Sequence, residues 1–322
     1  MLNIAELMRG RMRSNTTVSL ILVYVAICLA FAFLSPFFMT VKNFLNIGMF
    51  TSIIGIMAAG VTVAMLLGAI DISQWAVAAV TGLMAASMLN HGQSLLAVFA
   101  VCLAIGLLCG SINGLLVAVC RIPAIIATIG TMSIFRGIGY LAVNGLTVMI
   151  DNKPFETIGT GRVLGVVPVA MLIVVVVLLV IWYILNYTAF GRKVYAVGGN
   201  VNASYLAGIN VRAVTFGSMV ICSVCAAFAG LMVASQVGAA IPSTGEGSEM
   251  DVLAAVILGG ISLSGGKGRI SGTVIGILIL ATIQNGLTML SVPSFFQMII
   301  RGTVLILAVL MDVVRSGALK KQ

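Results

Sequence analysis

The chain has 322 residues, of which 61% are hydrophobic and only 8% charged, and its formal net charge is +9. This composition lies far outside the range of soluble domains and leaves no room for a sizeable aqueous domain. The 17 basic residues are scattered among apolar runs, so they form no patch for nucleic acid. Because a spanning helix needs about 20 apolar residues, the composition predicts an all-α membrane protein with about ten transmembrane helices.

Apolar stretches, divided at charges, prolines and glycines, predict where the chain crosses the membrane. The first stretch is longer than a typical signal core, so we interpret it as an uncleaved span. The eighth, of about 14 residues, is too short to cross unaided, which favours a broken or partly re-entrant helix. The predicted spans are 17–34, 50–68, 75–90, 94–120, 124–143, 167–186, 213–235, 251–264, 271–290 and 294–313.

Basic residues indicate the orientation of these spans, because short cytoplasmic loops carry an excess of Lys and Arg. With the amino terminus inside, only Lys42, Lys153 and Arg162 are external. The cytoplasmic set comprises Arg9, Arg11, Arg13, Arg121, Arg192, Lys193, Arg212, Lys267, Arg269, Arg315, Lys320 and Lys321. This bias predicts a multi-pass protein with both termini in the cytoplasm.

The two halves of the chain share a weak internal sequence repeat. Asp71 opens a small-residue stretch that is followed by Asn113, and Asp251 opens another that is followed by Asn285. The ten-span topology places Asp71 at the inner side and Asp251 at the outer side, as an inverted repeat requires. The spacings differ between the halves, so a chance match of common small residues stays open beside the repeat.

Glycines recur at helical spacing in two of the spans. Gly106, Gly110 and Gly114 lie four residues apart, as do Gly272 and Gly276. Such stripes let helix backbones approach closely in lipid. They indicate either packing within one bundle or a contact between subunits.

Residue patterns for catalysis and for ATP binding are missing from the sequence. His91 is the sole histidine, the carboxylates are dispersed, and no catalytic constellation is recognisable. The Gly266-Lys267 pair is followed by Gly268 where a phosphate-binding loop needs Ser or Thr. We therefore expect a chain that is not an enzyme and binds no metal or cofactor of its own.

Polar residues in two other places carry functional information. The long connection at 187–212 is predicted to be cytoplasmic, and its 200–207 segment can form a short helix. It is either a solvated linker or the docking surface for a separate motor. Arg136 and Arg301 fall inside spans, where they either pair with polar groups or line a pathway.

Four stretches resemble the permeases of bacterial ribose-type ABC sugar importers. Together with the span pattern they cover most of residues 40–313. They are GAIDIS at 68–73, SINGLLVAVCRIPAIIATIGTMSIFRGIGYL at 111–141, FGRKVYAVGGNVNASYLAGINV at 190–211 and GSEMDVLAAVILGGISLSGGKGRISGTVIGILIL at 247–280. The sequence departs from the family at 74–76, where Gln-Trp-Ala stands in place of the usual Val-Gly-Ser.

The resemblance implies an ABC importer permease fold, with residues 1–322 forming one permease domain in the bacterial inner membrane. It implies a homodimer, or a pair with a related permease, and a soluble sugar-binding protein on the periplasmic or extracellular side. It also implies cytoplasmic ABC ATPase subunits, which use ATP and Mg. The substrate is expected to be a small sugar, ribose or a relative. An ion-coupled secondary transporter of a small polar solute and a non-transporting scaffold are the alternatives.

Three sets of functional residues follow from the resemblance and from the polar residues of the spans. The substrate pathway is assigned to Asp71, Ser73, Trp75, Asn113, Arg136 and Asn285. Coupling to the ATPase is assigned to Gly191, Arg192, Gly198, Gly199, Asn200 and Gly208. Docking of the binding protein is assigned to Glu246, Glu249 and Asp251.

Overall fold

The computed structural model describes residues 16–316, which are mostly helical. The first helices are α2 (Thr16–Leu34), α3 (Val41–Leu66), α4 (Gln74–Asn90), α5 (Leu95–Gly114) with its π-helical end η1 (Leu115–Val119), and α6 (Ala124–Ala142). They are followed by α7 (Lys153–Thr160), α8 (Val169–Tyr187), α9 (Ala189–Gly199) and α10 (Val201–Leu206). The last are α11 (Val211–Val237), α12 (Glu249–Leu258), α13 (Ile270–Met289) and α14 (Ser294–Ser316).

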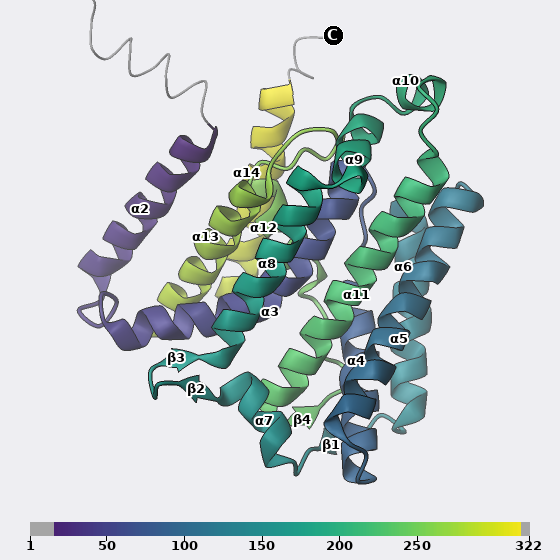
Figure 1. The fold of residues 1–322 in the computed structure, drawn as a ribbon. Helices are drawn as coiled ribbons and strands as arrows, with labels where there is room; N and C mark the ends of the chain where they lie inside the picture. Colours follow the sequence, from purple (N-terminus) through teal and green to yellow (C-terminus); the bar gives the residue numbers. More distant parts are fainter. Residues whose placement is uncertain (1–15, 317–322) are drawn as a thin grey trace, which may run out of the picture.

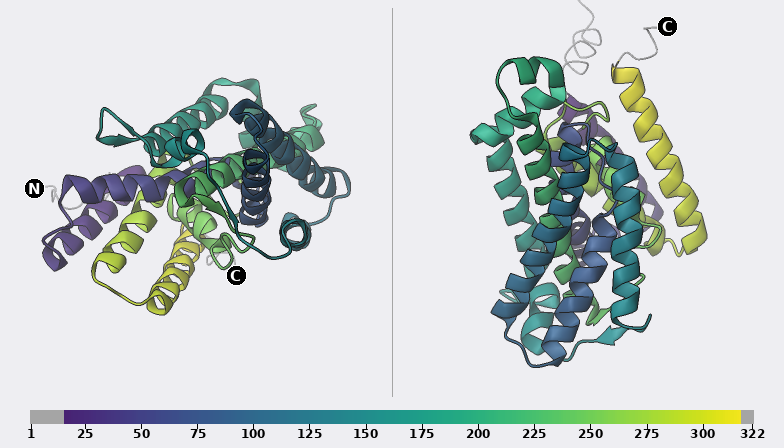
Figure 2. Two further views of the ribbon diagram at one scale, coloured as in Figure 1. Left: turned by 90° about the horizontal axis from the view of Figure 1, so that it is seen from below. Right: turned by 90° about the vertical axis from the view of Figure 1, so that its right-hand side faces the viewer.

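Four two-residue strands form two small antiparallel pairs. β1 (Val148–Met149) pairs with β4 (Ala239–Ala240), and β2 (Arg162–Val163) pairs with β3 (Val167–Pro168). Both pairs lie with α7 at one end of the bundle, which we call the α7 end (Figure 1). The hairpin of α9 and α10 and the carboxy-terminal end of α14 lie at the opposite end, the α9 end (Figures 1 and 2).

A helix lies at each of the ten predicted span positions. Seven of the described helices are long and apolar enough to cross a membrane: α2, α3, α5 with η1, α6, α8, α11 and α13. The other three are α4, of 17 residues, α12, of 10, and α14, whose apolar part is Ser294–Leu310. The structure confirms the all-α membrane class and the shortness of the eighth segment, and the remaining crossings stay a prediction.

Helix α3 begins nine residues before the predicted span 50–68. The predicted span excluded the stretch with Lys42 and Gly48, because spans were divided at charges and glycines, but the Thr40 hydroxyl accepts a hydrogen bond from Asn43 N (3.3 Å) and caps the helix. The Asn43 amide in turn donates to the carbonyl of Phe38 (3.0 Å). A local cap thus extends the helix into a polar stretch.

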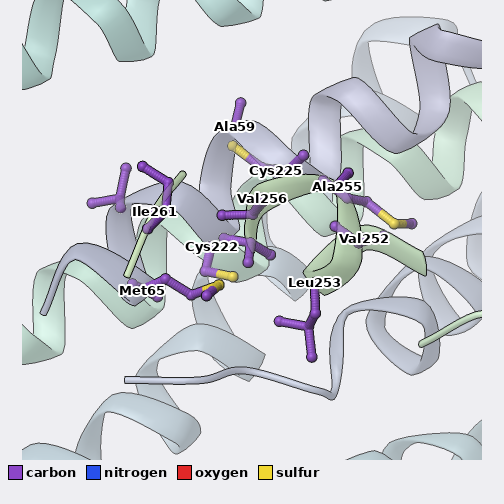
Figure 3. Close-up of a cluster of buried hydrophobic side chains, with 14 of the residues drawn as sticks. Ala59, Met65, Cys222, Cys225, Val252, Leu253, Ala255, Val256 and Ile261 are labelled. Atoms are coloured by element: carbon purple, nitrogen blue, oxygen red, sulfur yellow. The ribbon is translucent and has the colours of Figure 1, made fainter. Parts of the chain in front are cut away.

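The two longest helices, α3 and α11, pack against each other at the centre of the bundle. A Cβ added at Gly60 would come within 2.9 Å of Cys222 Cα, so the backbones approach as closely as glycine permits. Figure 3 shows Cys222 and Cys225 of α11 beside Ala59 and Met65 of α3, with side chains of α12 around them. Each central helix also packs on a pair from the other half of the chain, α3 on α12 and α13, and α11 on α4 and α5.

The glycine stripes lie inside this single bundle. Added Cβ atoms at Gly106 and Gly110 would come within 3.0 Å of backbone atoms of α11, and one at Gly114 would collide with Phe216. Gly276 faces the backbone of α12 in the same way, and Gly272 faces Gly259, the residue that follows α12. The interpretation as packing within one chain is therefore the correct one for both stripes.

Candidate functional site

The chain is not helical between α3 and α4, and this break carries the first candidate site. Asp71 and Ser73 lie in it, and both are fully buried. Asp71 Oδ1 accepts hydrogen bonds from Ser73 N (2.8 Å) and Ser73 Oγ (2.7 Å). The carboxylate thereby replaces the hydrogen-bond partners that the interrupted backbone of Ser73 lacks.

This break is tied to α5 and α6 by a chain of polar side chains. Asn113 Nδ2 donates to Ser73 Oγ (2.9 Å), and Thr131 Oγ1 donates to Asn113 Oδ1 (2.7 Å). The Thr128 hydroxyl also accepts a hydrogen bond from Ile72 N (3.2 Å). Asp71, Ser73 and Asn113, three of the residues predicted for the substrate pathway, therefore lie together, and they bond to one another inside closely packed protein. The two threonines were missed, because a threonine in an apolar span carries no distinguishing signal in the sequence.

A second non-helical segment, 241–248, connects β4 to α12 and runs back along α4. The start of the segment lies beside the middle of α4, since a Cβ at Gly82 would be 4.0 Å from Ala240 Cβ. Its end lies beside the start of α4, since Trp75 donates from Nε1 to Ser248 O (2.9 Å). Trp75 also packs on Gly245, where a Cβ would overlap the indole. Asn90, the last residue of α4, lies about 22 Å from Trp75 along the helix. The segment therefore penetrates deep into the bundle, and α12 starts beside Trp75.

Arg136 of α6 binds the same segment, 241–248, through its side chain. Its guanidinium donates to the carbonyls of Thr244 (2.6 Å) and Pro242 (3.3 Å) and pairs with Glu249 (3.1 Å). Glu246 accepts a hydrogen bond from the Tyr140 hydroxyl (2.8 Å). Of the two interpretations of an arginine within a span, pairing with polar groups is the one that the structure supports. Trp75 and Arg136 thus lie apart from the Asp71 network.

The three acids predicted for docking differ in their surroundings. Asp251 pairs with Arg301 (2.7 Å), and its side chain is 15% exposed, the same fraction as that of Glu249. The Glu246 side chain is 49% exposed. Glu249 and Asp251 therefore hold α12 in place, whereas Glu246 is available to solvent.

The predicted coupling segment forms the hairpin of α9 and α10. Asn200 caps α10, since its Oδ1 accepts a hydrogen bond from Ala203 N (2.9 Å). Arg192, Gly199, Asn200 and Gly208 are exposed, whereas Gly191 is buried against the carbonyls that end α8. The short helix expected at 200–207 is confirmed as α10. Helix α9 was missed, because its three glycines suggested a turn.

The hairpin makes close backbone contacts with two other segments at what we call the glycine junction, residues 66–68, 198–199 and 264–266. Gly266 N donates to Leu66 O (2.7 Å), and a Cβ at Gly265 would be 2.8 Å from Gly68 N. A Cβ at Gly198 would overlap Leu66 O and come within 2.7 Å of Gly266 N. The turn at 264–266 depends on glycine, since both Gly265 and Gly266 have positive φ angles.

Tyr195 adds a side-chain bond beside the junction. Its hydroxyl donates to Gly268 O (3.2 Å). Burial raises the pKa of Tyr195, and the nearby Arg269 charge lowers it by a smaller amount. The phenol therefore stays protonated at neutral pH and keeps donating to the loop.

Asn285 lies elsewhere, on the wall of a cavity of about 870 Å³ between α3, α11 and α13. It is 8% exposed, and its Oδ1 has no hydrogen-bond partner among the described residues. The predicted pathway residues are therefore distributed over three places rather than one.

Interrupted helices buried in an apolar bundle, with polar side chains at the breaks, define a polytopic membrane transport protein. The comparison with protein families identifies which one. The family described as "Branched-chain amino acid transport system / permease component" matches residues 43–309. The chain belongs to this family of permease components.

Named permeases are similar in sequence to this chain over nearly its whole length. The ribose import permease protein RbsC of Escherichia coli K12 is 42% identical, over 87% of this chain and 88% of its own. RbsC of Bacillus subtilis 168 is 39% identical, over 88% of each chain. The L-arabinose ABC transporter permease protein AraH of Azospirillum brasilense is 34% identical, over 92% of this chain and 88% of its own. No solved structure matches the chain.

Proposed function

We propose that the chain is the transmembrane permease subunit of an ATP-driven, binding-protein-dependent importer for a small sugar, ribose or a related pentose. The observation that carries the proposal is the similarity to ribose and arabinose permeases along almost the entire chain. The family's description refers to branched-chain amino acids, but the three relatives above are named for sugars. ATP and Mg then act in a partner ATPase, and the permease contributes the route through the membrane.

The α9–α10 hairpin is the part that we assign to ATPase docking. It lies at the end of the bundle, and its exposed face carries Arg192, Gly199, Asn200 and Gly208. Its inner face meets the glycine junction, which leads directly to the break that holds Asp71. A solvated linker would not need a backbone contact so close that glycine is required. ATPase closure would therefore reach the interrupted α3–α4 segment through residues 66–68.

The direction of the chain in the membrane follows from the same assignment. Arg121, Arg192, Lys267 and Arg269 belong to the segments next to the α9 end, as expected for a cytoplasmic face. The inverted repeat is supported by the correspondence of α3–α6 with α11–α14. Each series begins with the longest helix of its half, continues through a non-helical segment, and then resumes in a shorter helix.

A binding protein would dock on the α7 end in this orientation. We assign Glu246 as a contact, because its side chain is 49% exposed although it lies 3.9 Å from Arg136, whereas the side chains of Glu249 and Asp251 are each 15% exposed. Charges at such interfaces mainly set encounter rate and register. Glu246→Lys should weaken docking most at low salt, whereas docking that does not change with salt would remove Glu246 from the interface.

The buried Asp71 favours one competing function, an ion-coupled transporter acting alone, since such proteins use intramembrane carboxylates. The energy source separates the two functions. Proteoliposomes holding the permease, the ATPase and the binding protein encoded beside it should accumulate D-ribose or L-arabinose only when ATP is hydrolysed. Uptake driven by a proton or sodium gradient without the ATPase would refute the importer and support the alternative.

A further inference from the structure

Asp71 is the most enclosed acid of the described chain. It has no exposed surface, whereas every other acid whose side chain the structure describes is at least partly exposed. Its Oδ1 accepts two hydrogen bonds from Ser73. Its Oδ2 is equally buried but has no hydrogen-bond partner among the described residues. An ionised carboxylate would therefore keep part of its charge on an oxygen that receives no hydrogen bond.

No basic side chain compensates such a charge within the described residues. None of the ion pairs there includes Asp71. The titratable groups that face it are two thiols, those of Cys222 on α11 and Cys109 on α5. A thiol is a weak donor and is ordinarily neutral at pH 7, so neither can serve as a counterion. An ionised Asp71 would thus be an unpaired charge inside an apolar bundle, a state that buried acids avoid by taking up a proton.

A second acceptor without a donor lies three residues further along the chain. Gln74 is 1% exposed, and its Oε1 also has no hydrogen-bond partner among the described residues. Its Nε2 donates to the backbone carbonyl of Asp71, which holds the glutamine side chain against the break. Buried polar atoms are rarely left without a partner. The break therefore contains two buried acceptors and lacks one hydrogen.

We propose that Asp71 is a neutral carboxylic acid in the folded protein, with its proton on Oδ2 and with Gln74 Oε1 as the acceptor of that proton's hydrogen bond. A protonated carboxyl group has one O–H donor and keeps its other oxygen as an acceptor. Oδ1 then continues to accept from Ser73, while the O–H supplies the missing donor. Asp71 is in this sense a positioning residue, which links Ser73 to the first residue of α4 without placing a charge in the break.

The inference goes beyond the proposed function and bears on its ion-coupled alternative. Coupling to a cation requires an intramembrane carboxylate that exchanges the cation during transport. A neutral acid that is sealed in protein and bonded on both oxygens serves to hold the break together instead. Asp251, at the matching place in the sequence, differs because it pairs with Arg301 (2.7 Å).

Infrared difference spectroscopy of the purified full-length permease tests the protonation state directly. The sample is kept at neutral pH in a maltoside detergent, which has no ester carbonyl to mask the signal. The wild-type protein should show the C=O stretching band of a protonated carboxylic acid, and Asp71→Asn should remove it. Asp251→Asn is the matched control, since it makes the same chemical change at an acid that is paired with an arginine, and it should leave the band in place.

The asparagine variant should fold, because an amide offers one acceptor and one donor as the neutral acid does. A second variant covers the case in which it does not. Gln74→Leu removes the acceptor proposed for the Asp71 proton, so the band should remain but move to higher frequency as its hydrogen bond is lost.

Three results would overturn the proposal. They are the absence of a protonated-acid band from the wild-type protein at neutral pH, a band that persists in folded Asp71→Asn, and a band that does not move in folded Gln74→Leu. A carboxylate that binds a cation would give the first of these results. The spectra need neither solute nor ATPase, so they are independent of the proposed function. Absence of ATP-dependent uptake of D-ribose and of L-arabinose by the wild-type protein would refute that function alone.

Discussion

Replacement of Gly198 by alanine should uncouple ATP hydrolysis from transport, because a Cβ there has no space. It would overlap Leu66 O and lie 2.7 Å from Gly266 N, so α9 must withdraw by about 1.5 Å to reach ordinary contact distances. Overpacking of this kind costs about 1–3 kcal/mol. Loss of the bond between Gly266 N and Leu66 O (2.7 Å) would add about 1 kcal/mol.

The combined cost of about 2–4 kcal/mol disfavours the docked position of α9 by roughly 30-fold or more, at 1.4 kcal/mol for each factor of ten. Gly130 of α6 is the matched control, since nothing lies within 4 Å of a Cβ at that position. In proteoliposomes, Gly198→Ala should retain the ATPase subunit but lose most sugar uptake, whereas Gly130→Ala should stay within about twofold of wild type. Equal uptake by the two variants would refute the assignment of the glycine junction to coupling.

Other contacts lead to predictions that thermal unfolding of the purified protein can check. Arg136→Ala leaves Glu249 unpaired at 15% exposure and should destabilise the fold by about 3 kcal/mol; an unchanged melting temperature would contradict this. Asn113→Leu should reduce the folded yield rather than transport per folded molecule, because it removes the bonds to Ser73 and Thr131. Tyr195→Phe should cost about 0.5–1.5 kcal/mol. Since burial raises the Tyr195 pKa, its contribution is complete below the unfolded value near 10 and disappears as pH rises through the raised value.

The class of protein and the positions of its main helices could be predicted from composition and apolar run length, because lipid forces backbone groups to pair within a helix. The same argument identified the short eighth segment, which is α12. The prediction missed α9, because Gly191, Gly198 and Gly199 have low helix propensity. Gly191 is packed on the Leu185 carbonyl and Gly198 on the Leu66 carbonyl, and no local pattern records those neighbours.

The candidate site was predictable as a set of polar residues but not as an arrangement. Asn113 and Asn285 have equivalent sequence surroundings, yet one is saturated by Ser73 and Thr131 and the other borders a cavity. Arg136 illustrates the same limit. Its partner Glu249 is 113 residues away along the chain, so the ion pair follows from tertiary packing alone.

The break at residues 67–73 is attached at both ends, and this arrangement indicates how a signal could cross the bundle. At one end, the glycine junction joins it to α9 through Leu66 and Gly68. At the other, Ser73 is bonded to Asn113 on α5, and Trp75 in the next turn holds Ser248 before α12. Displacement of α9 would therefore act directly on the break, which is bonded in turn to α5 and, through Trp75, to the segment before α12. Among the described glycines the closest contact, that of Gly198 with the Leu66 carbonyl, therefore lies where a movement of α9 would enter the break.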